Sequence, residues 1–179
     1  MALASILHRF RIALSDIDRD VYKKIDIRLA KHPSETDHYL LTRVLAYALN
    51  EGENLEFSPL GLGDPNQPAL IQKGSHGILL WIEIGNPSAR KIHKASKAAK
   101  VVKIYTYKDP EVLIREIHEN KIFNSSELKI FAFSPGLLNR LADLLQRDNK
   151  WTLVHNGGSL MIQIGDIMEQ GELKLYSIL

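Results

Sequence analysis

The apolar and polar positions of this chain repeat with two different periods, which predicts both strands and helices. A period of two predicts strands over Ser5–Leu14 and Tyr22–Leu29, joined by an acidic turn. A period near 3.6 predicts a helix from Ser34 to about residue 50. Ser34 is expected to cap this helix, and Asp37 completes a capping box.

From residue 55 onward, short apolar runs alternate with amphipathic stretches. We expect further strands over 55–58, 78–85, 101–107, 128–134 and 173–178, a hairpin over 151–155 and 159–164, and helices over 88–100, 109–120 and 135–146. A loop rich in proline and glycine is expected over 59–68. Strand–helix–strand units imply parallel crossovers. The predicted class is α/β, with a mixed β-sheet core flanked by helices, an N-terminal strand pair and a C-terminal hairpin, in a single domain over residues 1–179.

One predicted strand, 78–85, carries the chemistry that stands out most. Its even positions are all apolar, and its other face holds Leu79, Trp81 and a single carboxylate, Glu83. A strand that is apolar on both faces is covered on both faces. Glu83 should therefore be buried near the carboxyl end of the strand, where α/β sheets bind ligands. Such a charge needs a cation, hydrogen-bond donors or a proton.

The segment after this strand is basic and contains no acid. Its first four cations are Arg90, Lys91, Lys94 and Lys97, which stay on one broad face of a helix. One interpretation is a solvated helix surface, and the other is a patch that contacts the phosphates of nucleic acid. For Glu83 the alternatives are an ion pair with Arg90, Lys91 or Lys94, and a functional site.

Composition narrows the classes of protein. The net charge of +2 does not by itself imply nucleic-acid binding. The chain has no cysteine, which excludes disulfides, zinc–thiolate centres and thiol nucleophiles. No apolar run approaches the roughly 18 to 20 residues that cross a bilayer. We therefore expect a cytoplasmic protein with no membrane partner.

Several blocks of sequence together resemble the YaeQ family across essentially the whole chain. They are His32-Pro33-Ser34-Glu35-Thr36, the loop ending at Pro68-Ala69-Leu70, Trp81-Ile82-Glu83-Ile84-Gly85-Asn86-Pro87, Arg90-Lys91-Ile92-His93-Lys94-Ala95 and Val102-Lys103-Ile104-Tyr105-Thr106-Tyr107. The resemblance implies a variation of the PD-(D/E)XK fold, which is restriction-endonuclease-like. In such nucleases, carboxylates hold magnesium and a lysine assists the attack of water on a phosphodiester.

The resemblance also assigns roles to residues. It makes Glu83 and Lys94 the catalytic pair, with Glu35, Asp64 and Glu83 as ligands of magnesium. Gly85 stands where the motif lysine is usual, and Asn66-Gln67-Pro68 stands where the family usually has Asp-Glu-Pro. Each departure removes a group from the implied metal site.

Two functions follow as alternatives, and whether the protein is an enzyme is left open. The first is a weak or degenerate magnesium-dependent phosphodiesterase or nuclease. The second is a module without catalysis or any cofactor, which binds nucleic acid or a protein partner through the basic helix 88–100, with Arg90, Lys91, Lys94 and Lys97 as contacts.

Overall fold

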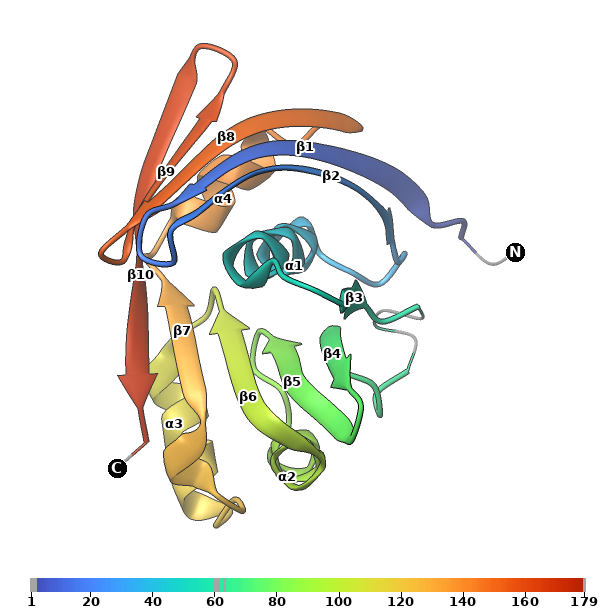
Figure 1. Ribbon diagram of the computed structural model, residues 1–179, viewed down its shortest axis with the longest axis vertical. Helices are drawn as coiled ribbons and strands as arrows, with labels where there is room; N and C mark the ends of the chain where they lie inside the picture. Colours follow the sequence, from blue (N-terminus) through green and yellow to red (C-terminus); the bar gives the residue numbers. More distant parts are fainter. Residues whose placement is uncertain (1–2, 60–61, 63, 179) are drawn as a thin grey trace. The chain divides into compact units, whose positions relative to one another are not determined.

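The computed structural model describes residues 3–59, 62 and 64–178, and within them ten strands and four α-helices are formed (Figure 1). The chain divides into two compact units. The first unit contains residues 1–49 and 133–174, and the second contains 50–132 and 175–179. That the whole chain acts as a single domain stays a prediction. No helix in the described part of the chain is long and apolar enough to cross a membrane.

The first unit is a curved, mixed sheet with the strand order β2-β1-β8-β9-β10. Its elements are β1 (Ile6–Asp16), β2 (Val21–Lys31), α1 (Asp37–Asn50), α4 (Leu137–Asp143), β8 (Asp148–Asn156), β9 (Ser159–Ile164) and β10 (Ile167–Ser177), whose last residues belong to the second unit. β1 pairs with β2 antiparallel and with β8 parallel. Strands β1, β2 and β8 curve around α1 (Figure 1). Alternation in β1 buries Phe10, Ile12 and Leu14 and leaves the intervening side chains on the open face.

The second unit holds the strand order β7-β6-β5-β4-β3. Its elements are β3 (Leu55–Phe57), β4 (Leu70–Gly74), β5 (Gly77–Ile84), α2 (Ala89–Ala98), β6 (Ala99–Thr106), α3 (Pro110–Glu119), a short 3₁₀ helix η2 (Ser125–Glu127) and β7 (Lys129–Phe133). β5, β6 and β7 are parallel to one another, as the crossovers predict. β4 pairs antiparallel with β3 and β5, so this arrangement is mixed too.

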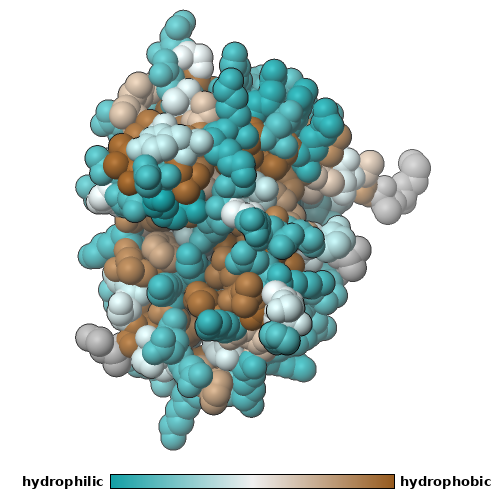
Figure 2. All heavy atoms as spheres, viewed as in Figure 1, coloured by the Kyte–Doolittle hydropathy of each residue, from teal (hydrophilic) through white to brown (hydrophobic). Residues whose placement is uncertain are grey.

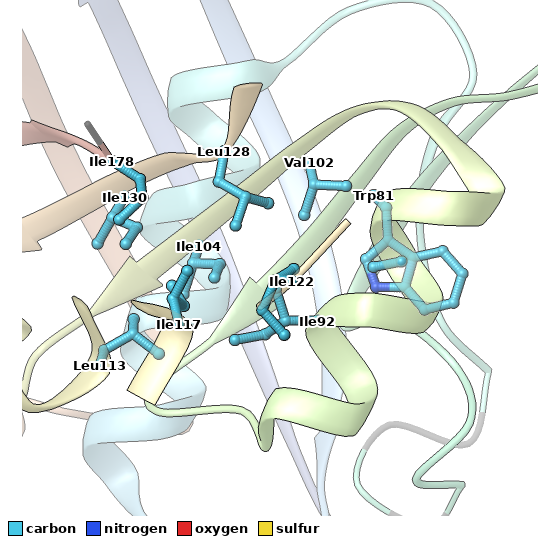
Figure 3. Close-up of a cluster of buried hydrophobic side chains, with 11 residues drawn as sticks. Trp81, Ile92, Val102, Ile104, Leu113, Ile117, Ile122, Leu128, Ile130 and Ile178 are labelled. Atoms are coloured by element: carbon cyan, nitrogen blue, oxygen red, sulfur yellow. The ribbon is translucent and has the colours of Figure 1, made fainter. Parts of the chain in front are cut away.

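One apolar cluster in the second unit ties β5, β6 and β7 to helices α2 and α3. It contains Trp81, Ile92, Ala95, Val102, Ile104, Leu113, Ile117, Ile122, Leu128, Ile130 and Ile178, all buried. Figure 3 shows Ile104 and Ile117 pointing toward one another. Because both helices are amphipathic, each buries its apolar stripe here and exposes its charges.

The predicted order of elements is confirmed, but several details were wrong. Ser34 does not cap the first helix, because its hydroxyl bonds His32 instead, and the Thr36 Oγ1 accepts the N–H of Tyr39 at 3.1 Å. Strand β4 was not predicted; its five residues follow a proline-rich loop and lack a clear alternation. Leu60, Gly61 and Gly63 of the predicted loop lie outside the described residues. The helix predicted over 135–146 is shorter and begins only after Gly136.

Candidate functional site

The buried carboxylate of Glu83 lies at the carboxyl end of β5, where the sequence predicted it. Its side chain is 1% exposed. Trp81, two residues earlier on the same side of the strand, donates its indole N–H to Oε1 at 2.6 Å. Lys91 approaches from α2, with 3.0 Å between its Nζ and Oε2 of Glu83. Both carboxylate oxygens are therefore engaged, one by a neutral donor and one by a cation.

The turn between β5 and α2 brings Lys91 to Glu83. Gly85 adopts φ +76°, a left-handed conformation that glycine allows at no steric cost, and the chain leaves the strand there. Ser88 then caps α2 by accepting the N–H of Lys91. This cap fixes the first turn, so the side chain of Lys91 projects back over the end of β5.

Burial raises the pKa of Glu83 above its ordinary value of 4.5, although Lys91 and Trp81 act in the opposite direction. The charged form loses more hydration in the interior than its two partners restore. A buried carboxylate with a raised pKa is a feature of reactive sites, but buried structural ion pairs have it as well. Whether Glu83 is a reactive group or part of a structural ion pair therefore has to be judged from the other residues around it.

The sequence suggested that Lys94 could reach back to Glu83, but in the structure its side chain bonds another group. Lys94 lies one turn further along α2, is exposed, and donates to the backbone carbonyl of Asn66 at 3.3 Å. In the same loop, Asp64 accepts the N–H of Asn66 at 2.9 Å. Lys94 thus holds the loop that contains Asp64 and Asn66, while Lys91 takes the ion pair. The cation that pairs with Glu83 was among the three alternatives, and only side-chain packing selected it.

Glu35 belongs to the first unit and forms a buried ion pair there. Arg43 of α1 donates from Nε and Nη2 to the two carboxylate oxygens, at 2.7 and 2.8 Å. The backbone N–H of His32 adds a third bond at 3.0 Å. Glu35 and Arg43 are 4% and 3% exposed. With its oxygens committed to Arg43, Glu35 has the environment of a structural residue.

The carboxylates that the resemblance assigns to magnesium do not fit a metal centre. In residues 3–59, 62 and 64–178, no group of three or more histidine, aspartate or glutamate side chains could hold a metal ion. Divalent magnesium prefers carboxylate oxygens that are free to coordinate it. Here Glu83 is engaged by Lys91 and Trp81, and Glu35 by Arg43.

The remaining cations of α2 have exposed side chains, although Lys94 also bonds the carbonyl of Asn66. Arg90, Lys94 and Lys97 are exposed, whereas Lys91 is partly buried against Glu83. Residues at i, i+4 and i+7 follow one another along one side of a helix, so these three form a single exposed stripe. We call Arg90, Lys94 and Lys97 the α2 stripe. Of the four residues predicted to contact nucleic acid, three are thus on the accessible side.

Comparisons with a family model and with curated proteins identify the same family. The model of the YaeQ protein family matches residues 1–172. An uncharacterized YaeQ protein from Salmonella typhi is 31% identical over 149 residues, which cover 82% of each chain. One from Escherichia coli K12 is 35% identical over 107 residues, which cover 60% of this chain and 59% of that protein.

Two crystal structures share the fold. The YaeQ protein from Xanthomonas axonopodis pv. citri superposes with a TM-score of 0.88 at 25% identity, covering 98% of this chain and 99% of that one. The YaeQ protein from Pseudomonas syringae gives a TM-score of 0.87 at 30% identity, covering 97% and 96%. The family match, the curated relatives and the two structures agree: this chain belongs to the YaeQ family.

Proposed function

We propose that this protein binds the phosphate backbone of duplex nucleic acid through the α2 stripe and does not cleave it. The observation that carries the proposal is that the basic residues of α2 fall into two groups, one paired with an acid and the other exposed. Its one partly buried lysine, Lys91, is neutralised by Glu83, whereas Arg90, Lys94 and Lys97 face solvent. The helix contains no acid that could pair with them.

The charge in the first turn of α2 opposes helix stability, which supports a functional reason for it, whereas Lys97 in the last turn is favourably placed. The amino end of a helix carries partial positive charge and favours acids, yet the first turn of α2 has Arg90 and Lys91 and no acid. Glu83 offsets the charge of Lys91. Arg90 remains at the positive end, where an external anion such as a phosphate would be attracted.

The dimensions of the α2 stripe suit a nucleic-acid backbone. Arg90 and Lys97 are separated by about 10 Å along the helix axis, from a rise of about 1.5 Å per residue. Successive phosphates of one strand of a duplex are about 3.4 Å apart along its axis. The three side chains can therefore reach phosphates of one strand. Such contacts position a protein without reading base sequence.

Removal of the three charges should weaken binding and its dependence on salt. For Arg90→Gln/Lys94→Gln/Lys97→Gln we expect lower affinity for duplex DNA of any sequence. The slope of log Kobs against log salt should fall in magnitude by about 2 to 3, because each phosphate contact contributes about 0.9. Fluorescence anisotropy with a labelled duplex over a salt series measures both quantities.

A matched control is available in the same unit. Lys73, Lys121 and Lys129 are exposed and lie outside α2. Their triple replacement by glutamine changes the net charge equally but should leave most of the affinity and slope. An equal loss in both triple variants, or no loss in the α2 variant, would contradict the proposal.

Metal-dependent hydrolysis of phosphodiesters is the second candidate, favoured by the buried, raised-pKa carboxylate at the end of a parallel strand. In it, Glu83 and Lys94 would be catalytic, with Glu35 and Asp64 as further ligands. Because the carboxylates are engaged elsewhere, we expect no magnesium- or manganese-dependent cleavage of DNA or RNA that the Glu83→Gln variant lacks. A gel assay with both proteins tests this. Cleavage by the natural protein, lost in the variant, would establish hydrolysis instead.

The folding of the Glu83→Gln variant has its own expected pH profile. Because the pKa of Glu83 is raised in the folded state, the folded protein binds this proton more tightly than the unfolded chain. Its contribution to stability is full below the ordinary value of 4.5 and is lost as the pH rises through the raised pKa. The stability of the variant relative to that of the natural protein should therefore rise from acid to neutral pH. Melting temperatures of both proteins across this pH range measure the difference.

A further inference from the structure

The open face of the sheet in the first unit carries a second concentration of positive charge. Pairing places Arg11 of β1 opposite Asp26 of β2 and Lys150 of β8, and Ala13 opposite Lys24 and Thr152. Residues directly opposite in a ladder lie on the same face. On β1, β2 and β8 the charged residues of this face are Arg9, Arg11, Lys24, Arg28 and Lys150, together with Asp26 and Asp148. Figure 2 shows mainly hydrophilic residues along the outer margin of this sheet, at the top of the view.

Local ion pairs neutralise only part of this charge. Arg9 makes two bonds to Asp26, at 2.9 and 2.6 Å, and Arg11 bonds Asp148 at 3.0 Å. Lys24 and Lys150 have no ion pair with any residue in the described part of the chain. The two acids that β2 and β8 place here are thus committed to arginines, and neither acid pairs with the exposed Lys24 or Lys150.

These lysines border a hollow of about 600 Å³. Its lining includes the cations Arg11, Lys24 and Lys150, the acid Asp26, which is bonded to Arg9, and the uncharged residues Ala13, Thr152 and Gln163. Ala13 lies between Lys24 and Thr152 in the ladder, and its small side chain leaves the space open. The β9–β10 hairpin rises on the outer side of β8 (Figure 1), and Gln163 and Gly165 close the hollow at that end. The volume falls within the range of ligand-binding clefts.

The chemistry of this face favours a polymeric anion with flat, unpaired bases. Arg28 lies beyond the hollow on the same face, next to the Arg9–Asp26 pair, and extends the positive charge along the sheet, which suits an extended backbone better than a compact ion. Tyr22 precedes Lys24 by two residues on the same side of β2 and is 63% exposed. Proteins that bind single strands combine a cationic groove with aromatic side chains on which bases stack. Thr152 and Gln163 add hydrogen-bonding groups inside the groove.

We propose that this cationic face, centred on Lys24 and Lys150, binds single-stranded nucleic acid, with phosphates on the lysines and a base against Tyr22. The surface lies in the first unit and shares no residue with the α2 stripe. The inference therefore goes beyond the duplex binding proposed above, and each proposal can fail without affecting the other.

The test uses the full chain and a labelled oligothymidylate of about 16 nucleotides, a length that suits such sites. For Lys24→Gln/Lys150→Gln, the slope of log Kobs against log salt should fall in magnitude by about 1.4, since each contact to a single strand contributes about 0.7. The affinity should fall about fivefold or more, and Tyr22→Ala should weaken binding by a similar factor through lost stacking. Lys73→Gln/Lys129→Gln is the charge-matched control and should bind like the natural protein.

Other outcomes would overturn the proposal. Equal binding by the natural protein and the Lys24/Lys150 variant would exclude this face. Complete displacement of the oligonucleotide by tripolyphosphate at the same phosphate concentration would assign the hollow to a small anion. Stronger competition by a polyglutamate peptide would assign it to an acidic protein segment. The triple variant of the α2 stripe, assayed with both ligands, separates the two surfaces, because it should lose duplex binding and keep single-strand binding.

Discussion

Replacement of Glu35 by alanine is expected to lower the free energy of unfolding by about 3 to 5 kcal/mol, which is the cost of leaving a buried charge without its partner. Arg43 would keep its guanidinium at 3% exposure with no carboxylate to accept its two bonds. The N–H of His32 would also lose its acceptor. Urea denaturation followed by circular dichroism measures the change.

Two further proteins decide whether the effect comes from the pair. Replacing both partners by apolar residues of similar size, Glu35→Leu with Arg43→Met, should recover most of the loss, because no buried charge remains. Glu172→Ala removes an exposed acid from the same unit and should change stability by less than about 0.5 kcal/mol. A small effect of Glu35→Ala would show that Arg43 reaches water or another acceptor, and would leave Glu35 available for a ligand.

Replacement of Trp81 by alanine should cost a similar amount, about 3 to 5 kcal/mol, through the cavity that it leaves in the core. Trp81 is 3% exposed and packs in the cluster that joins β5 to α2 (Figure 3). Its indole also donates to Glu83. The variant therefore loses packing and hydrogen bonding together, and urea denaturation should report the sum.

Trp81→Phe separates these contributions. It keeps most of the apolar contact but removes the N–H donor, and should cost about 1 to 3 kcal/mol, the range for an unsatisfied buried acceptor. The pKa of Glu83 should rise further, because the indole N–H lowers it in the natural protein. Phe123→Ala, at an aromatic residue that is 46% exposed in the same unit, should have little effect. If Trp81→Phe equals the natural protein in stability, the bond to Glu83 contributes nothing.

The regular elements were predictable wherever local chemistry and apolar period agree. Asp109 and Pro110 begin α3 as their preferences dictate, and the Gly157-Gly158 turn joins β8 to β9. At the start of α1, three polar residues compete for the cap. Glu35 turns to Arg43, Ser34 bonds His32, and Thr36 is left to cap. These partners lie only two to eight residues apart, but the pattern of residues does not show which polar side chain takes which partner, because side-chain packing sets it.

In the candidate site, too, some features were predictable from the local sequence and others were not. Alternation along one strand was sufficient to place Glu83 in the interior and Trp81 on its side, because the period of two is fixed by covalent geometry. The choice of Lys91 over Lys94 depends on a shift of about one turn along α2, which Gly85 and the packing of α2 set. The hollow bordered by Lys24 and Lys150 could not be predicted, since their strands are far apart in sequence and only pairing of both strands with β1 brings them to one face.

The sequence by itself therefore determined the alternation of strands and helices, the burial of Glu83 and the cationic character of α2, because these depend on residues that are close along the chain. The tertiary structure decided which cation faces Glu83, that Glu35 pairs with Arg43 within the first unit, and that cations of β1, β2 and β8 share one face. Each of these depends on side-chain packing or sheet register, which the apolar pattern along the chain does not specify.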